Sequence, residues 1–167
     1  MSGQGDDMME NSTGPAQRLE WPVTMFVEAL KDAVATMAGI TMESVDESFL
    51  TGEATMGGMM VLQGDPSAVL MILADQPSVA AIVTNMTGID SGELTIEDLR
   101  DGLSELVNMV AGTVRGRLTG SGNRFKLSSP LAVTGEHLAV YAKRHVECSL
   151  SRFVAGDIWL ELKIFYI

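Results

Sequence analysis

The period of the apolar residues changes twice from helical to strand-like, and this feature constrains the fold most. Spacings of three and four residues predict a first helix between Pro22 and Gly39. Strand-like sequence follows as far as Asp75 and is interrupted by glycine- and proline-containing turns. We therefore expect three consecutive strands in this region, at about residues 43–51, 54–63 and 67–75.

The same order recurs in the second half of the chain. A short helix is expected over residues 76–86, and a long helix over residues 95–119 begins with a capping signal at Thr95 and Asp98. Apolar residues at intervals of three and four give the long helix a continuous buried stripe. The later strands are expected at about residues 125–134, 138–142, 144–153 and 157–166.

Two successions of a helix followed by strands predict an α+β fold. Adjacent strands joined by short turns pair antiparallel, and amphipathic helices cover one face of such a sheet. We expect two layers, with helices packed on a largely antiparallel sheet of about six strands. The two halves have similar content, α-β-β-β-α and α-β-β-β, which indicates an ancient duplication.

The length of 167 residues corresponds to one domain, which we expect to span residues 21–167. Residues 1–20 are polar and acidic without apolar periodicity, and we expect them to form a disordered acidic tail. The longest apolar run, residues 68–74, is far shorter than the roughly 20 residues of a membrane helix. With a lone cysteine, Cys148, and no signal peptide, the chain is expected to be soluble and cytoplasmic.

Charge and missing motifs argue against several classes of function. The formal net charge of −11 argues against nucleic acid or an anionic membrane as the main partner, since both require clustered cations. The sequence contains no zinc-binding, phosphate-loop, dinucleotide-binding or nucleophile-elbow motif. His137 and His145 are therefore interpreted as structural or exposed residues, and the methionines as core residues.

Polar residues on the outer face of the long helix form the one candidate site. At about 100° per residue, this face lies opposite the buried stripe and places Glu105 beside Asn108. Gly112 costs about 1 kcal/mol relative to alanine in a helix, but it would let another macromolecule approach closely. A solvated helix surface is the simpler interpretation. The residues of this face are Asp101, Glu105, Asn108, Gly112 and Arg115.

A resemblance to a known family changes the balance between these interpretations. The segment Glu105-Leu106-Val107-Asn108, preceded by Asp101, resembles the E-x-x-N signature of the CheC/CheX/FliY family of bacterial chemotaxis phosphatases. The order of the helices, glycine pairs and turns agrees over about residues 22–167. The chain is therefore similar to this family over nearly its whole length.

The number of E-x-x-N pairs distinguishes the types within this family. Members of the CheC type carry a second pair on the pseudo-symmetric helix, whereas this chain has Lys31 three residues after Glu28. Asn85, in the short helix, is preceded by Ile82 in place of a glutamate. With a single intact pair, the chain most resembles CheX.

The resemblance implies an enzyme that removes the phosphoryl group from the phosphorylated aspartate of a CheY-type receiver domain. Asn108 would orient the attacking water, Glu105 would pair with a receiver lysine, and Asp101, Gly112 and Arg115 would contact the receiver. No metal or cofactor is expected on this chain, because the receiver supplies Mg²⁺. A homodimer is also implied, and strand pairing at the edges of an open sheet offers a route to it.

One alternative function remains open at this point. The chain could be a non-catalytic module that binds the receiver or scaffolds a chemotaxis or flagellar complex. The intact pair of Glu105 and Asn108 favours the enzyme, because a binding module has no need of the asparagine.

Overall fold

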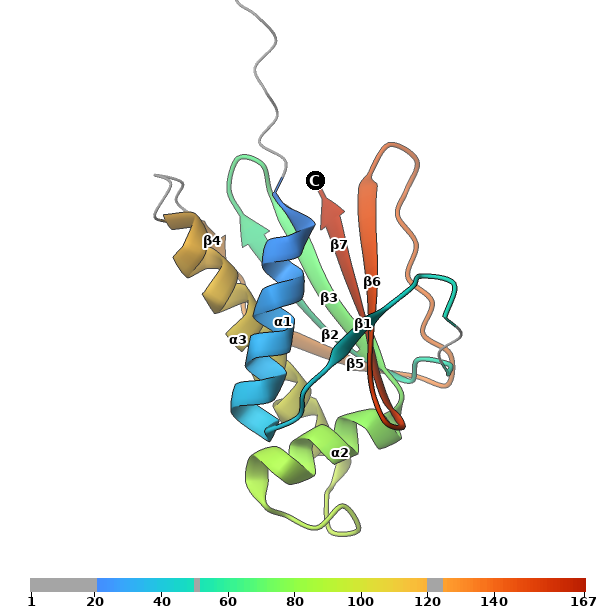
Figure 1. The fold of residues 1–167 in the computed structure, drawn as a ribbon. Coiled ribbons are helices and arrows are strands. Elements are labelled where there is room, and N and C mark those ends of the chain that lie inside the picture. Colours follow the sequence, from blue (N-terminus) through green and yellow to red (C-terminus); the bar gives the residue numbers. More distant parts are fainter. Residues whose placement is uncertain (1–20, 50–51, 120–124) are drawn as a thin grey trace, which may run out of the picture.

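A computed structural model describes residues 21–49, 52–119 and 125–167. The expected N-terminal tail, residues 1–20, lies outside the described residues. The model confirms an α+β fold (Figure 1). The helices are α1 (Val23–Ala38), α2 (Gln76–Thr87) and α3 (Ile96–Thr119), and the strands are β1 (Glu43–Val45), β2 (Met56–Gln63), β3 (Ala68–Ala74), β4 (Lys126–Leu127), β5 (Leu131–Thr134), β6 (Glu147–Ala155) and β7 (Ile158–Tyr166).

These strands form one antiparallel sheet in the order β1-β6-β7-β3-β2-β4, with β5 also paired to β2. The two central strands, β3 and β7, come from different halves of the chain. Each half also contributes its first strands to the other half, since β1 pairs with β6 while β4 and β5 pair with β2. The strand order thus has the two-fold character that a duplication predicts.

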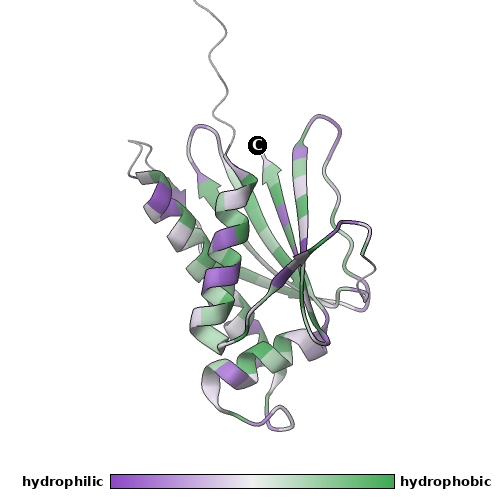
Figure 2. Ribbon diagram, in the orientation of Figure 1, coloured by the Kyte–Doolittle hydropathy of each residue, from purple (hydrophilic) through white to green (hydrophobic). Residues whose placement is uncertain are grey.

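All three helices lie on the same face of the sheet (Figure 1). Alternation along β7 directs Leu160, Leu162 and Ile164 into the main core beneath the helices. Figure 2 shows hydrophobic residues along the central strands. Within the described residues, no helix combines the length and the apolar character needed to cross a membrane.

The long helix α3 sits close to its neighbours because two glycines leave room for it. A Cβ atom at Gly58 of β2 would lie 2.6 Å from Cγ2 of Val107, and one at Gly102 would lie 2.4 Å from Cγ2 of Val83 on α2. Any larger residue at either position would push α3 away. These contacts fix the position of α3 against both the sheet and α2.

The segment at residues 138–142 is not a strand, which corrects the sequence prediction. It runs over the face of the sheet that points away from the helices, where Leu138 and Val140 pack against a small cluster of Met71, Leu73 and Phe165. Its apolar residues alternate because they contact this face of the sheet, not because the segment forms ladder hydrogen bonds.

Two other predicted strands are shorter than expected. The first ends at Val45, because Asp46 accepts a hydrogen bond from the backbone N–H of Ser48 at 2.8 Å and starts a turn. The prediction for residues 125–134 divides into β4 and β5, and Ser128 and Pro130 lie between them. The Ser128 hydroxyl accepts from the N–H of Val61 at 2.9 Å, and Pro130 has no N–H to donate.

Candidate functional site

The candidate site lies on α3, whose first turn is fixed by a capping box. The backbone N–H of Asp98 donates to the hydroxyl of Thr95 at 3.2 Å, and the Asp98 carboxylate accepts from the backbone N–H of Thr95 at 2.8 Å. The hydrogen bonds from Thr95 hold the pKa of Asp98 below its ordinary value. The capping signal recognised in the sequence is therefore formed as expected.

Burial of one side of α3 turns the opposite side toward solvent. Leu106 and Val107 are 1% and 0% exposed, whereas Glu105 and Asn108, on either side of them, are exposed. Their spacing of three residues makes them neighbours on the helix surface. Within the described part of the chain, neither side chain has a hydrogen bond or an ion pair. No residue that the structure describes therefore competes with another molecule for these two polar groups.

Gly112 continues the same face one turn beyond Asn108. A Cβ atom at Gly112 would meet nothing within 4 Å, and the same holds for Gly116. The packing of the described residues therefore does not require glycine at either position, in contrast to Gly102. The consequence is a stretch of α3 where the backbone is accessible beside the candidate pair.

Asp101 and Arg115 are exposed at the two ends of this face. Neither takes part in an ion pair with any residue that the structure describes. Arg117, two residues further on, behaves differently because its guanidinium binds Glu28 at 3.3 Å and Asp32 at 2.9 Å on α1. The face thus brings together all five residues that the sequence predicted, and we call it the α3 ridge: Asp101, Glu105, Asn108, Gly112 and Arg115.

A family model described as chemotaxis phosphatase CheX matches residues 56–153, which is more than half of the chain and includes the α3 ridge. The chain belongs to the CheX family. No curated protein sequence matches it.

Solved structures share the fold. The chemotaxis protein CheX from Vibrio vulnificus superposes with a TM-score of 0.79 and 22% identity, over 91% of this chain and 99% of that chain. CheX in a CheX–CheY–BeF₃–Mg²⁺ complex from Borrelia burgdorferi gives a TM-score of 0.72 and 20% identity, over 89% of this chain and 99% of that chain. The FliM middle domain from H. pylori is less similar, with a TM-score of 0.55 and 14% identity over 86% of this chain and 85% of that chain. At these identities the likeness establishes the CheX fold.

The equivalent helix of the other half, α1, does not carry a second pair of this kind. Glu28 is already bound to Arg117, and Lys31 stands where an asparagine would be needed. The acidic residues of α1 therefore help to hold α3 in place, and the CheX fold of this chain presents a single E-x-x-N ridge.

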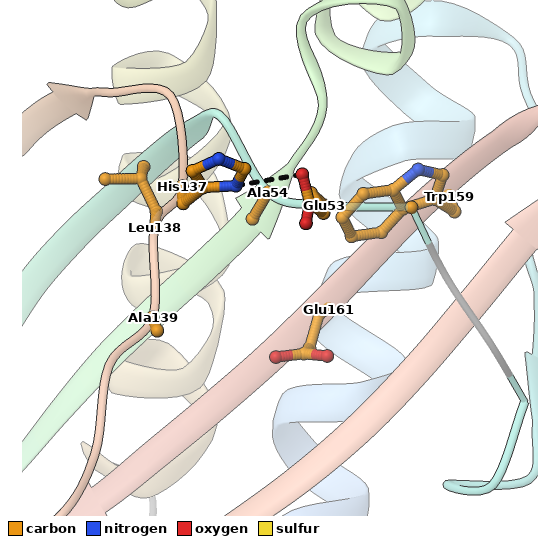
Figure 3. A pocket seen from close by; sticks show the side chains of 8 residues that line it. Glu53, Ala54, His137, Leu138, Ala139, Trp159 and Glu161 are labelled. Carbon is orange, nitrogen blue, oxygen red and sulfur yellow. Dashed lines mark ion pairs between the residues drawn. The ribbon is translucent and has the colours of Figure 1, made fainter.

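The opposite face of the sheet holds a pocket that the sequence analysis did not identify (Figure 3). It has a volume of about 260 Å³, and the imidazole Nδ1 of His137 lies 2.8 Å from the carboxylate of Glu53 at its rim. Glu161 lies in its wall, 8% exposed, with its carboxylate oxygens 3.0 Å from Arg152 and 3.1 Å from Lys163. The interrupted apolar pattern of β7 at Glu161 is the only sequence signal for this pocket.

These contacts give the pocket a structural role. Both charges that face Glu161 are cationic, so its carboxylate is neutralised by its neighbours. Arg152 also donates to the backbone carbonyls of Glu47 and Phe49, and Lys163 donates to the carbonyl of Val140 at 3.2 Å. Arg152 and Lys163 therefore bind two irregular segments, one after β1 and one between β5 and β6, to the sheet. Among the described residues, no three His, Cys, Asp or Glu side chains are grouped so that they could hold a metal ion.

Proposed function

We propose that this CheX-family protein hydrolyses the aspartyl phosphate of a CheY-type receiver domain, and that the receiver docks on the α3 ridge. The observation that carries the proposal is the exposure of Glu105 and Asn108 side by side, without partners among the described residues. A buried or internally bonded pair would have no means of reaching a second protein. The family description and the fold shared with the CheX of a CheX–CheY complex support the choice of partner.

The reaction requires little covalent chemistry from this chain. An aspartyl phosphate is an acyl phosphate, so its carboxylate is a good leaving group, and the step that remains is attack by a water molecule in line with the P–O bond. The water oxygen bonds to phosphorus, the bond between phosphorus and the aspartate oxygen breaks with its electron pair staying on the carboxylate, and a proton of the water passes to a phosphoryl oxygen. The products are an aspartate carboxylate and inorganic phosphate.

Asn108 is proposed to hold this water. Its side-chain amide has an oxygen that accepts a hydrogen bond from the water and a nitrogen that donates to a phosphoryl oxygen. Positioning of the water lowers the activation barrier to hydrolysis without a change of charge on the enzyme. The glutamine that orients water in GTPases acts in the same way. Mg²⁺ and the phosphoryl-binding lysine are supplied by the receiver, so this chain needs no cofactor of its own.

Glu105 is proposed to pair with that receiver lysine. Its carboxylate is one helical turn from Asn108, and an ion pair at this distance would fix the register between the two proteins. A contact of this kind gives orientation more reliably than net affinity. Asp101, Gly112 and Arg115 would form the remainder of the docking surface.

A turnover assay tests the proposal directly. The chain is mixed in catalytic amounts with a phosphorylated receiver and Mg²⁺, and the release of phosphate is followed. We expect many turnovers per chain, and a loss of about 10²-fold in kcat for Asn108→Ala, which is the scale for removing one positioned transition-state partner. Glu105→Ala is expected to raise KM and lower kcat together.

Asn85→Ala is the matched control, because Asn85 is an exposed asparagine on α2 and is not one of the ridge residues. Its turnover should equal that of the wild-type chain. Full activity of Asn108→Ala would contradict the proposed role of the amide. A stoichiometric effect without turnover would instead indicate the alternative function, a non-catalytic receiver-binding module.

A further inference from the structure

Three residues of the α3 ridge stand at intervals of seven. Asp101, Asn108 and Arg115 are all exposed, and seven residues correspond to two helical turns with a rotation of only about 20°. Their Cα atoms therefore form a nearly straight line along α3, with about 10 Å between successive members. Along this line the ridge carries an acid, an amide and a cation.

The two ends of the line have opposite charges that the described residues do not compensate. Asp101 has Glu105 one turn away on the same face, so the N-terminal end carries two negative charges. Arg115 is the cation of the C-terminal end. The acids of α1 do not neutralise it, because Glu28 and Asp32 bind Arg117 on another side of the helix.

Stabilisation of the helix dipole does not account for this arrangement. Acidic residues stabilise the first turn of a helix and basic residues the last turn, but the effect decays within that turn. Glu97 and Asp98 occupy the first turn of α3, and Arg117 occupies the last. Asp101 and Arg115 lie further inside the helix, where such a contribution is small.

We propose that the charge polarity of the α3 ridge gives the receiver a single docking orientation, and that Arg115 selects receivers with an acidic side chain at the matching place. This inference rests on the proposed function. The selected receiver presents a cationic group toward Asp101 and Glu105, and an acidic residue about 10 Å from its phosphorylated aspartate on the opposite side. A receiver turned by 180° would meet like charges at both ends, which opposes that orientation.

The experiment compares two substitutions that change the net charge equally. Arg115→Glu reverses the cation of the ridge, and Arg144→Glu makes the same change at an exposed arginine outside the ridge. With a phosphorylated receiver and Mg²⁺, we expect Arg115→Glu to raise KM about tenfold and to leave kcat within about twofold, because Arg115 is two turns from the amide. Arg144→Glu should leave both constants at the wild-type values.

A second variant tests polarity without a change in net charge. Asp101→Arg combined with Arg115→Asp keeps the same charged groups but exchanges the ends of the ridge. We expect weaker binding of this variant to a receiver that carries beryllofluoride and Mg²⁺, measured by calorimetry, with the thermal midpoint of unfolding unchanged. Salt should weaken binding of the wild-type chain more than binding of the exchanged variant, since added ions screen attractive charges.

The outcomes separate this inference from the proposed function. If wild-type turnover depends on Asn108 but the Arg115 and Arg144 variants have the same KM, the ridge polarity does not orient the receiver and the inference is wrong. Unchanged binding of the exchanged variant leads to the same conclusion. If the wild-type chain has no turnover with any receiver, the proposed function fails, and this inference fails with it.

Discussion

The exposure of Glu105 and Asn108 is decided by the residues between them. Leu106 and Val107 are buried against the sheet and the neighbouring helices, so the helical period turns both flanking residues outward. Sequence periodicity is sufficient to predict this direction. It does not predict that the two side chains have no partner among the described residues, because that depends on how far α1 and α2 extend over α3.

Substitution of Gly112 is expected to change stability and receiver docking in opposite directions. A Cβ atom there meets nothing within 4 Å, so Gly112→Ala should stabilise the helix by about 1 kcal/mol and raise Tm by roughly 2–4 °C. The added methyl group stands on the α3 ridge, and we expect it to lower kcat/KM with a phosphorylated receiver. Thermal unfolding and the turnover assay, run on the same samples, measure the two effects.

Gly102→Ala is the matched control on the same helix. Its Cβ atom would lie 2.4 Å from Cγ2 of Val83, so this substitution should lower Tm. A higher Tm with unchanged kcat/KM for Gly112→Ala would show that the receiver does not approach this part of the ridge.

At the scale of elements, the sequence predicted the helices better than the outer strands. The long helix was expected over residues 95–119 and is observed over Ile96–Thr119, because its cap, its apolar stripe and its length all agree. The segment 138–142 was predicted wrongly as a strand. Alternating apolar residues show that one side of a segment is buried, but they do not show whether its backbone pairs with a neighbouring strand.

The start of α3 provides a prediction about pH. Asp98 accepts hydrogen bonds from Thr95 in the folded state, and this lowers its pKa below the ordinary value of about 4. Its contribution to stability is therefore present above about pH 4 and is lost as the pH falls through the lowered pKa. Asp98→Ala should lower Tm at pH 7, and the difference from wild type should narrow below pH 4.

Calorimetric unfolding between pH 3 and pH 7 measures this difference. Asp90→Ala serves as the comparison, because Asp90 lies in the loop before α3 and accepts from Gly92 without capping a helix. A Tm difference for Asp98→Ala that stays constant across this range would mean that the charged form of the carboxylate does not stabilise α3.

At the scale of the whole molecule, the two halves of the chain exchange strands. The order of helices and strands in the sequence indicated the duplication, whereas the pairing of β1 with β6 and of β5 with β2 follows only from the three-dimensional arrangement. The pocket beside Glu161 was missed for a related reason, since its walls come from segments that are far apart in the sequence. Local patterns predict the elements and the ridge, but they contain little information on contacts between distant segments.

The exchanged strands leave β5 at one edge of the sheet, and this edge is the site we expect for the homodimer. Leu131 is 58% exposed and Val133 is 36% exposed, although both lie in a strand. An apolar edge strand favours pairing with a second copy, and lysine at an edge prevents such pairing.

Light scattering measures the mass in solution and tests this assignment. The wild-type chain should have twice its mass of 17.9 kDa, and Leu131→Lys combined with Val133→Lys should reduce this to the mass of one chain. Ser44→Lys, an exposed position on β1 at the other edge, should remain dimeric. A wild-type monomer, or a dimer that persists in the β5 variant, would contradict this assignment.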